Sequence, residues 1–301
     1  MKELILEQMD YADFINPIDI SDKILADIRK QSPLHQIPIP FPIHEVAKLL
    51  GIIEIKSLEN SVGFEGMLLK KEYEGYIFFN GQSHLVRQRF TIAHELGHWM
   101  IPWHTMDGRV SFKCDSNTTT DTMQAVSKIS NIPKIEVEAN RFAASLLLPK
   151  NEFKTAIKRE PCLKRLRQLA FDYKVSFQAF CFRFKELSDY DCAIIQHKDF
   201  IITNIFSTKN FPKLSVSFQV GSPISPRSIS ATTHTNTNLE PVQAKNWLYS
   251  DIPKYAELFE QLLIQEEGYR TTLLYLDTRN CLDEDELLYD ELSQWNPKFR
   301  R

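Results

Sequence analysis

The sequence of 301 residues lacks the features that mark several large classes of protein. It has no pair of cysteines in the CxxC pattern, and its five cysteines are scattered and odd in number. That usage is typical of reduced thiols, and it argues against a disulfide framework or a zinc site built on cysteine. A net charge of −3 gives no overall attraction to DNA or RNA, so direct nucleic-acid binding is not expected.

A long apolar run is also missing from the beginning of the sequence. Residues 1–17 carry four acidic side chains and no unbroken apolar stretch, so we expect neither a signal peptide nor a membrane anchor. On this basis we predict a cytoplasmic protein. No internal repeat occurs, and the Thr/Asn-rich stretch 232–238 indicates an exposed loop.

Sequence texture divides the chain into three parts. Residues 1–38 indicate an N-terminal helical extension and a proline-rich linker, because each proline disfavours helix in the residue before it. Residues 39–187 combine short apolar runs, typical of strands in one antiparallel sheet, with helical spacing from residue 83 onward. Residues 188–301 indicate a second α+β domain. The elements expected there are strands at 192–205, 214–220 and 271–276 and a helix at 253–265. The predicted fold class is therefore α+β.

The chemistry of the chain is indicated by an HExxH motif at positions 94–98. His94 and His98 lie four residues apart, so on a helix both imidazoles project from one face and can bind the same ion. Glu95 lies beside the first histidine, where its carboxylate can take a proton from metal-bound water and pass it to the leaving amine. We predict that Glu95 is the catalytic residue. The alternative, two unrelated histidines on a solvated helix face, is disfavoured because HExxH within a predicted helix rarely arises by chance.

A catalytic zinc takes three protein ligands and leaves one position open, so a third ligand is needed. His104, six residues after His98, fits the metzincin spacing, but Ile101 occupies the place of the glycine that lets the chain turn back. We expect His104 to be a surface residue beyond the helix end. The other candidates, Glu136 and Glu138, lie about 200° apart around a helix predicted at 135–148, so only one of them can face the metal.

Two separated stretches resemble the ImmA/IrrE family of metallopeptidases. The first is RFTIAHELGH at 89–98, and the second has the pattern ExxANxFAAxLLLP at 136–149. The resemblance covers residues 39–187, including a helical segment with helix-turn-helix character. In that family the metal ligands are the two histidines of HExxH and a glutamate four residues before the asparagine. The resemblance therefore implies a zincin-like catalytic domain that binds one zinc ion through His94, His98 and Glu136. Asn140, one turn after Glu136, is expected to hydrogen-bond a ligand.

The resemblance also implies a biological role. Family members typically cleave a helix-turn-helix repressor and so derepress a mobile element or a stress response. Residues 1–38 are too short and too acidic to be a DNA-binding domain, so we expect the repressor to be a separate chain encoded nearby. Residues 188–301 are only vaguely similar to the sensor-like domain of the radiation-response members.

Two alternatives stay open. One concerns the metal, because a site of two histidines and one glutamate also accepts manganese or iron. The other concerns activity: the protein is instead a non-catalytic, zinc-bound regulator that binds a repressor or DNA. An intact Glu95 argues against this second alternative, because a site kept only for structure has no need of a base.

Overall fold

The computed structural model describes residues 8–32, 35–59, 63–71, 74–104, 111–115, 134–232 and 234–279. They form two compact units: unit 1 is Met1–Ile157 with Arg167–Arg183, and unit 2 is Lys158–Leu166 with Phe184–Arg301. The chain therefore passes between the units three times. The described residues contain seven α-helices and two sheets, so the α+β prediction is confirmed. None of the described helices has the length and apolar character needed to cross a membrane.

The sheet of unit 1 has four strands in the order β1-β3-β2-β4. Their bounds are Ile52–Leu58 (β1), Phe64–Lys71 (β2), Glu74–Asn80 (β3) and Ser111–Asp115 (β4). β2 is antiparallel to both of its neighbours, whereas β1 runs parallel to β3. The sheet is therefore mixed, and the expectation of a wholly antiparallel sheet was wrong for this pair. β1 joins the far edge of β3 instead of pairing with β2, the next strand in sequence, and apolar patterning does not specify which strand is the partner.

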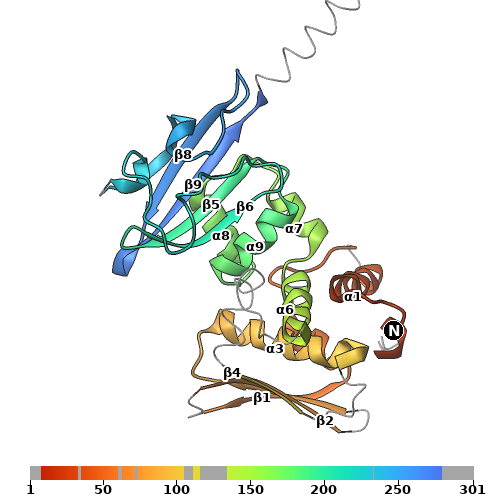
Figure 1. Ribbon diagram of the computed structural model, residues 1–301. Helices are drawn as coiled ribbons and strands as arrows, with labels where there is room; N and C mark the ends of the chain where they lie inside the picture. Colours follow the sequence, from red (N-terminus) through yellow and green to blue (C-terminus); the bar gives the residue numbers. More distant parts are fainter. Residues whose placement is uncertain are drawn as a thin grey trace, which may run out of the picture. The chain divides into compact units, whose positions relative to one another are not determined.

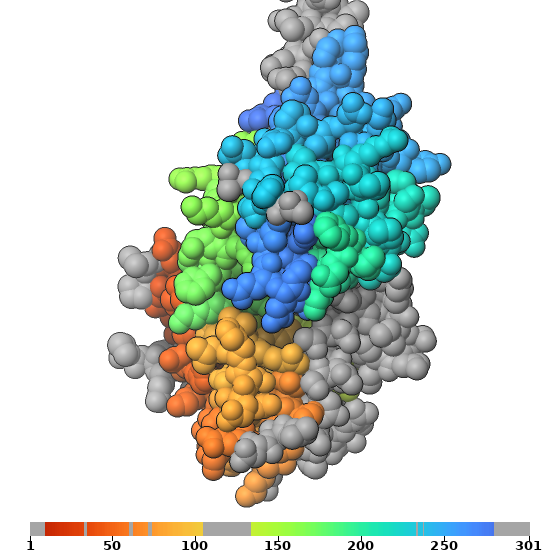
Figure 2. All heavy atoms as spheres, turned by 90° about the vertical axis from the view of Figure 1, so that its left-hand side faces the viewer, coloured from red at the N-terminus to blue at the C-terminus, as the bar shows by residue number. Residues whose placement is uncertain are grey.

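The second half of α3 (Leu85–Met100), the helix that carries the HExxH motif, is buried on all sides. Every residue from position 91 to 100 is buried, because β2 and β3 contact one side of α3 and α6 (Lys134–Leu147) contacts another. Figure 1 shows α3 between the sheet and α6, and in Figure 2 the orange atoms of the strands and α3 form one contiguous surface. The helix stops at Ile101, which is extended and precedes Pro102. The chemistry-bearing face of the helix is therefore fixed from both sides.

Three other described helices belong wholly to unit 1, and two are divided between the units. α1 (Pro17–Gln31) packs on α6, and Arg29 on α1 makes a bidentate ion pair with Glu152 on α7. The remaining bounds are Ile43–Leu49 (α2), Lys150–Ala156 (α7), Leu163–Asp172 (α8) and Phe177–Leu187 (α9). α8 and α9 are joined by four residues, in which Lys174 has a positive φ of 52°. α1 lies in the same compact unit as α3. The domain boundaries at residues 38 and 187 stay predictions.

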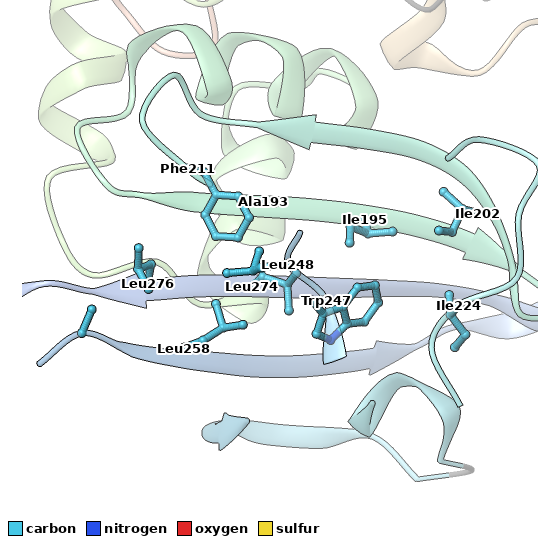
Figure 3. Packing of buried hydrophobic residues seen from close by; sticks show 11 residues of the cluster. Ala193, Ile195, Ile202, Phe211, Ile224, Trp247, Leu248, Leu258, Leu274 and Leu276 are labelled. Atoms are coloured by element: carbon cyan, nitrogen blue, oxygen red, sulfur yellow. The ribbon is translucent and has the colours of Figure 1, made fainter. Parts of the chain in front are cut away.

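Unit 2 is built on an antiparallel sheet with the strand order β6-β5-β9-β8-β7. The bounds are Cys192–Lys198 (β5), Ile201–Ser207 (β6), Asn236–Val242 (β7), Glu257–Ile264 (β8) and Tyr269–Asp277 (β9). One face carries a cluster of buried apolar side chains from β5, β8 and β9 (Figure 3). Trp247, fully buried, packs into that cluster from the segment between β7 and β8.

Three expectations for unit 2 were wrong. The helix predicted at 253–265 is instead strand β8, which hydrogen-bonds to β7 and β9 on its two sides. The strand predicted at 214–220 is a series of turns with one isolated bridge, Leu214 to Leu248, and Val216 is exposed. The loop predicted at 232–238 gives way to β7 from Asn236 onward. In each case hydrogen bonding to neighbouring strands, or the absence of such bonding, overrides the local sequence pattern.

Candidate metal centre

Three buried side chains converge where α3 meets α6. His94 and His98 come from α3, and Glu136 comes from the first turn of α6. The Nε2 atoms of the two histidines are 3.1 Å apart, and the Glu136 carboxylate oxygens lie 3.2 Å from His94 Nε2 and 3.5 Å from His98 Nε2. A tetrahedral zinc ion with bonds near 2 Å separates its ligand atoms by about 3.3 Å. The three groups therefore fit the donor set of one ion.

The orientation of His94 is fixed by an amide on α6. Asn140 Oδ1 lies 2.8 Å from His94 Nδ1. An amide oxygen only accepts hydrogen bonds, so Nδ1 carries the proton and the Nε2 lone pair is left pointing at the other two donors. Partners of this kind fix the ring and tautomer of metal-binding histidines. Asn140 thus lies one helical turn from Glu136 and contacts a candidate ligand.

Burial and mutual charge set the ionisation of the three groups. Burial, only partly offset by Glu136, lowers the pKa of His98 to about 4, so that this ring is neutral at pH 7. Burial also disfavours the charged form of His94, but the hydrogen bond to Glu136 and the charges of Glu95 and Glu136 outweigh it and raise its pKa. Burial acts against ionised Glu136 as well, yet its bonds to both histidines hold the carboxyl pKa well below the usual range. The site therefore keeps a carboxylate beside two imidazoles, an arrangement that attracts a cation.

Glu95 is fully buried, and β2 leaves room for its carboxylate through a glycine. A Cβ atom added at Gly66 would lie 2.7 Å from Glu95 Oε1 and 2.3 Å from Thr91 Cγ2. Only a residue without a side chain fits this close approach of strand and helix. Sequence reasoning missed Gly66, although a glycine inside a predicted strand is itself a signal that something approaches the backbone closely.

His104 is part of the same buried region, so the expectation of a surface residue was wrong. Its side chain belongs to the short 3₁₀ helix η2 (Pro102–His104), which folds back after α3, and it is 2% exposed. His104 Nδ1 lies 3.1 Å from His98 Nδ1, and His104 Nε2 lies 3.1 Å from Glu138 Oε2. Glu138 is not among the three clustered donor groups, but it is buried and also accepts a hydrogen bond from Trp103 of η2.

A helix that carries HExxH against a mixed sheet, with a buried glutamate beside the two histidines, is the arrangement of a zincin-like domain. Residues 63–185 match the family model of peptidase M78, described as the IrrE N-terminal-like domain. This match supports the ImmA/IrrE family of metallopeptidases, which the two sequence motifs predicted.

Comparisons with solved structures and with curated proteins add little to the family match. A solved structure of a Mycobacterium tuberculosis transcriptional regulator is similar at 13% sequence identity, with 89% of this chain and 79% of that chain covered and a TM-score of 0.45. No curated protein matches the sequence.

Proposed function

We propose that the protein is a zinc-dependent endopeptidase that cleaves a protein substrate, a helix-turn-helix transcriptional repressor. The observation that carries the proposal is the spacing of the three donor groups, which matches the edges of a zinc tetrahedron, with Glu95 next to the first ligand on the same helix. The family of the domain at 63–185 supports peptidase chemistry. A site of this composition also accepts manganese or iron.

In this proposal each residue of the site has one role. His94, His98 and Glu136 hold the ion, which when bound supplies Lewis-acid chemistry at the scissile carbonyl. Glu95 takes a proton from the attacking water and delivers it to the leaving amine. Asn140 holds the His94 ring in the tautomer that offers Nε2 to the ion. Gly66 gives the Glu95 carboxylate its space against β2.

Among the described strands the sheet has two edge strands, β1 and β4, and we propose that an extended substrate adds at β4, because its partner β2 carries Gly66 against Glu95. β2 is paired on both sides, with β3 and β4, so it has no free edge. Among the described strands β4 pairs with β2 alone. A substrate segment that adds to β4 as a further strand has its backbone hydrogen bonds satisfied by the sheet, as in other cases of strand addition.

The test is co-expression with a helix-turn-helix repressor encoded beside this protein, followed by mass spectrometry of the repressor. Wild type and Glu95→Gln are compared, because the substitution keeps the shape of the side chain and removes its ability to accept a proton. We expect a discrete repressor fragment with wild type and none with Glu95→Gln, while both proteins bind zinc equally. Glu240→Gln, an exposed substitution in unit 2, is the matched control and is expected to cleave as wild type does.

Other outcomes contradict the proposal. A fragment produced by Glu95→Gln at the wild-type rate would exclude Glu95 as the base. Absence of any fragment, with repressor and protein still co-purifying, would favour a non-catalytic zinc-bound regulator that acts by binding the repressor.

A further inference from the structure

Both ring nitrogens of His98 have polar side chains within contact distance. Nε2 points at His94 and Glu136, whereas Nδ1 lies 3.1 Å from His104 Nδ1. The second nitrogen of His104 lies in turn 3.1 Å from Glu138 Oε2. All three side chains are at least nine-tenths buried. A line of hydrogen bonds therefore runs from a candidate metal ligand on α3, through η2, to a carboxylate on α6.

If a cation is bound, the donor and acceptor properties of His98, His104 and Glu138 fix the direction of every hydrogen bond in this line. If Nε2 of His98 binds a cation, its ring proton must be on Nδ1, which then donates to Nδ1 of His104. Neutral His104 consequently carries its own proton on Nε2 and donates it to Glu138, a carboxylate that only accepts. Trp103 Nε1, which is only a donor, lies 2.8 Å from the same Glu138 oxygen and agrees with that assignment. Each proton then has one acceptor.

From this geometry we propose that His104 and Glu138 are positioning residues of the metal centre. Glu138 anchors His104, and His104 holds the His98 ring in the orientation and tautomer that binds the ion. The inference rests on the proposed metal site. It assigns the two candidate ligands different supports, because His94 has a neutral amide partner and His98 a carboxylate acting through a second imidazole. An ionised partner at the end of such a line makes the ligand nitrogen a stronger donor.

A purely structural role for the same contacts makes a different prediction. Glu138 also forms an ion pair with Lys134 at 3.4 Å and accepts from Trp103, so it helps to hold η2 against α6. If that were its whole role, its loss would lower the stability of the protein and leave metal affinity and ligand field unchanged. Zinc affinity and the ligand field therefore separate the two roles.

The experiment measures zinc affinity by competition with a chromophoric chelator and the visible spectrum of the cobalt-substituted protein. His104→Leu removes the link at similar volume, and Glu138→Gln keeps an acceptor without its charge. We expect His104→Leu to weaken zinc binding by about 10- to 100-fold and to shift the cobalt bands, with a smaller change in the same direction for Glu138→Gln. Lys134→Ala is the matched control: it removes the ion pair on an exposed side chain, leaves the line of hydrogen bonds intact, and is expected to bind zinc as wild type does.

A double variant tests whether Glu138 acts through His104. In the His104→Leu background, Glu138→Gln should change zinc affinity by less than about twofold, because the link is already broken. Equal zinc affinity and identical cobalt spectra in wild type and in folded single variants would overturn the inference while leaving the metal site in place. Failure of the wild-type protein to bind zinc would instead overturn the metal site itself. If His104→Leu fails to fold, as judged by circular dichroism, the near-isosteric Glu138→Gln variant decides.

Discussion

Gly66 shows how a single missing side chain shapes the candidate active site. It is the third residue of β2 and faces Thr91 and Glu95 on α3, at a distance where no Cβ atom fits. With glycine at position 66, β2 can approach α3 more closely than it could with any other residue there. This approach limits where the Glu95 carboxylate can lie relative to the two candidate ligand histidines.

We expect Gly66→Ala to reduce peptidase activity by at least about tenfold while zinc affinity changes little, because the new methyl group displaces Glu95 and not the ligands. Activity is measured as repressor cleavage, and zinc binding by chelator competition. Thr91→Ser in the Gly66→Ala background removes the closer of the two clashes and should restore part of the activity. Wild-type cleavage by Gly66→Ala alone would contradict the assigned contact.

His197 in unit 2 gives a residue-scale prediction about pH. The ring is fully buried, and burial together with the charge of Arg270 lowers its pKa from 6.5 to about 4. As the pH falls below 6.5, His197 binds a proton in the unfolded chain but stays neutral in the folded chain. Stability is therefore lost between pH 6.5 and about 4, by at most about 3 kcal/mol.

The check is urea denaturation at pH 7 and pH 4.5 of wild type and His197→Gln. The variant lacks the titrating group, so its free energy of unfolding should fall less between the two pH values than that of wild type. An equal fall in both proteins would show that His197 does not contribute to acid sensitivity.

At the scale of elements, a buried carboxylate fastens η3 (Ile229–Ala231) to the sheet of unit 2. Glu260 on β8 accepts from the backbone N–H of Ser230 at 2.8 Å, from the Ser230 hydroxyl at 2.5 Å, and from Trp247 Nε1 at 2.9 Å. The Ser230 hydroxyl also contacts Thr272 on β9, whose hydroxyl contacts His197. Two segments outside the strands, those of Ser230 and Trp247, are thereby held to one carboxylate.

Ser230→Ala removes the hydroxyl at the centre of this network and leaves Glu260 and Thr272 each short of one hydrogen bond. We expect the free energy of unfolding to fall by about 1–3 kcal/mol, measured by chemical denaturation. Ser250→Ala, at an exposed position in the same unit, should change it by less than about 0.5 kcal/mol. A Ser230→Ala variant as stable as the control would show that the network adds nothing to stability.

The elements also show what could be predicted from the sequence. The α+β class and the helix that carries HExxH followed from periodicity and a motif, both of which are local. The position of β1 beside β3, the conversion of residues 257–264 into strand β8, and the burial of His104 did not follow. Each of these depends on contacts with other segments, such as the pairing of β8 with β7 and β9 and the contact of His104 with Glu138, 34 residues later. Pro102 marks the end of α3 but does not specify that the chain turns back toward His98.

For the whole molecule, the division into two compact units predicts which helices and strands metal binding stabilises. All three candidate donors lie in unit 1, on α3 and α6. Zinc at a hundred times its dissociation constant should stabilise the folded unit by about 2.7 kcal/mol. We expect slower amide hydrogen exchange in α3 and α6 after zinc addition, and no change in β5, β8 and β9. Glu136→Gln should weaken the effect, and equal protection in both units would contradict it.

The threefold passage of the chain between the units has a consequence for synthesis on the ribosome. Residues 158–166 belong to unit 2, yet they emerge before the last segment of unit 1 and well before the strands of unit 2. Leu163 and Leu166 are buried in the finished protein, and the Leu163 backbone N–H donates to Gln261 on β8, almost a hundred residues later. A nascent chain halted near residue 187 lacks Gln261, the hydrogen-bond partner of Leu163, so we expect the unit with the candidate metal donors to leave the ribosome attached to an unfinished piece of unit 2.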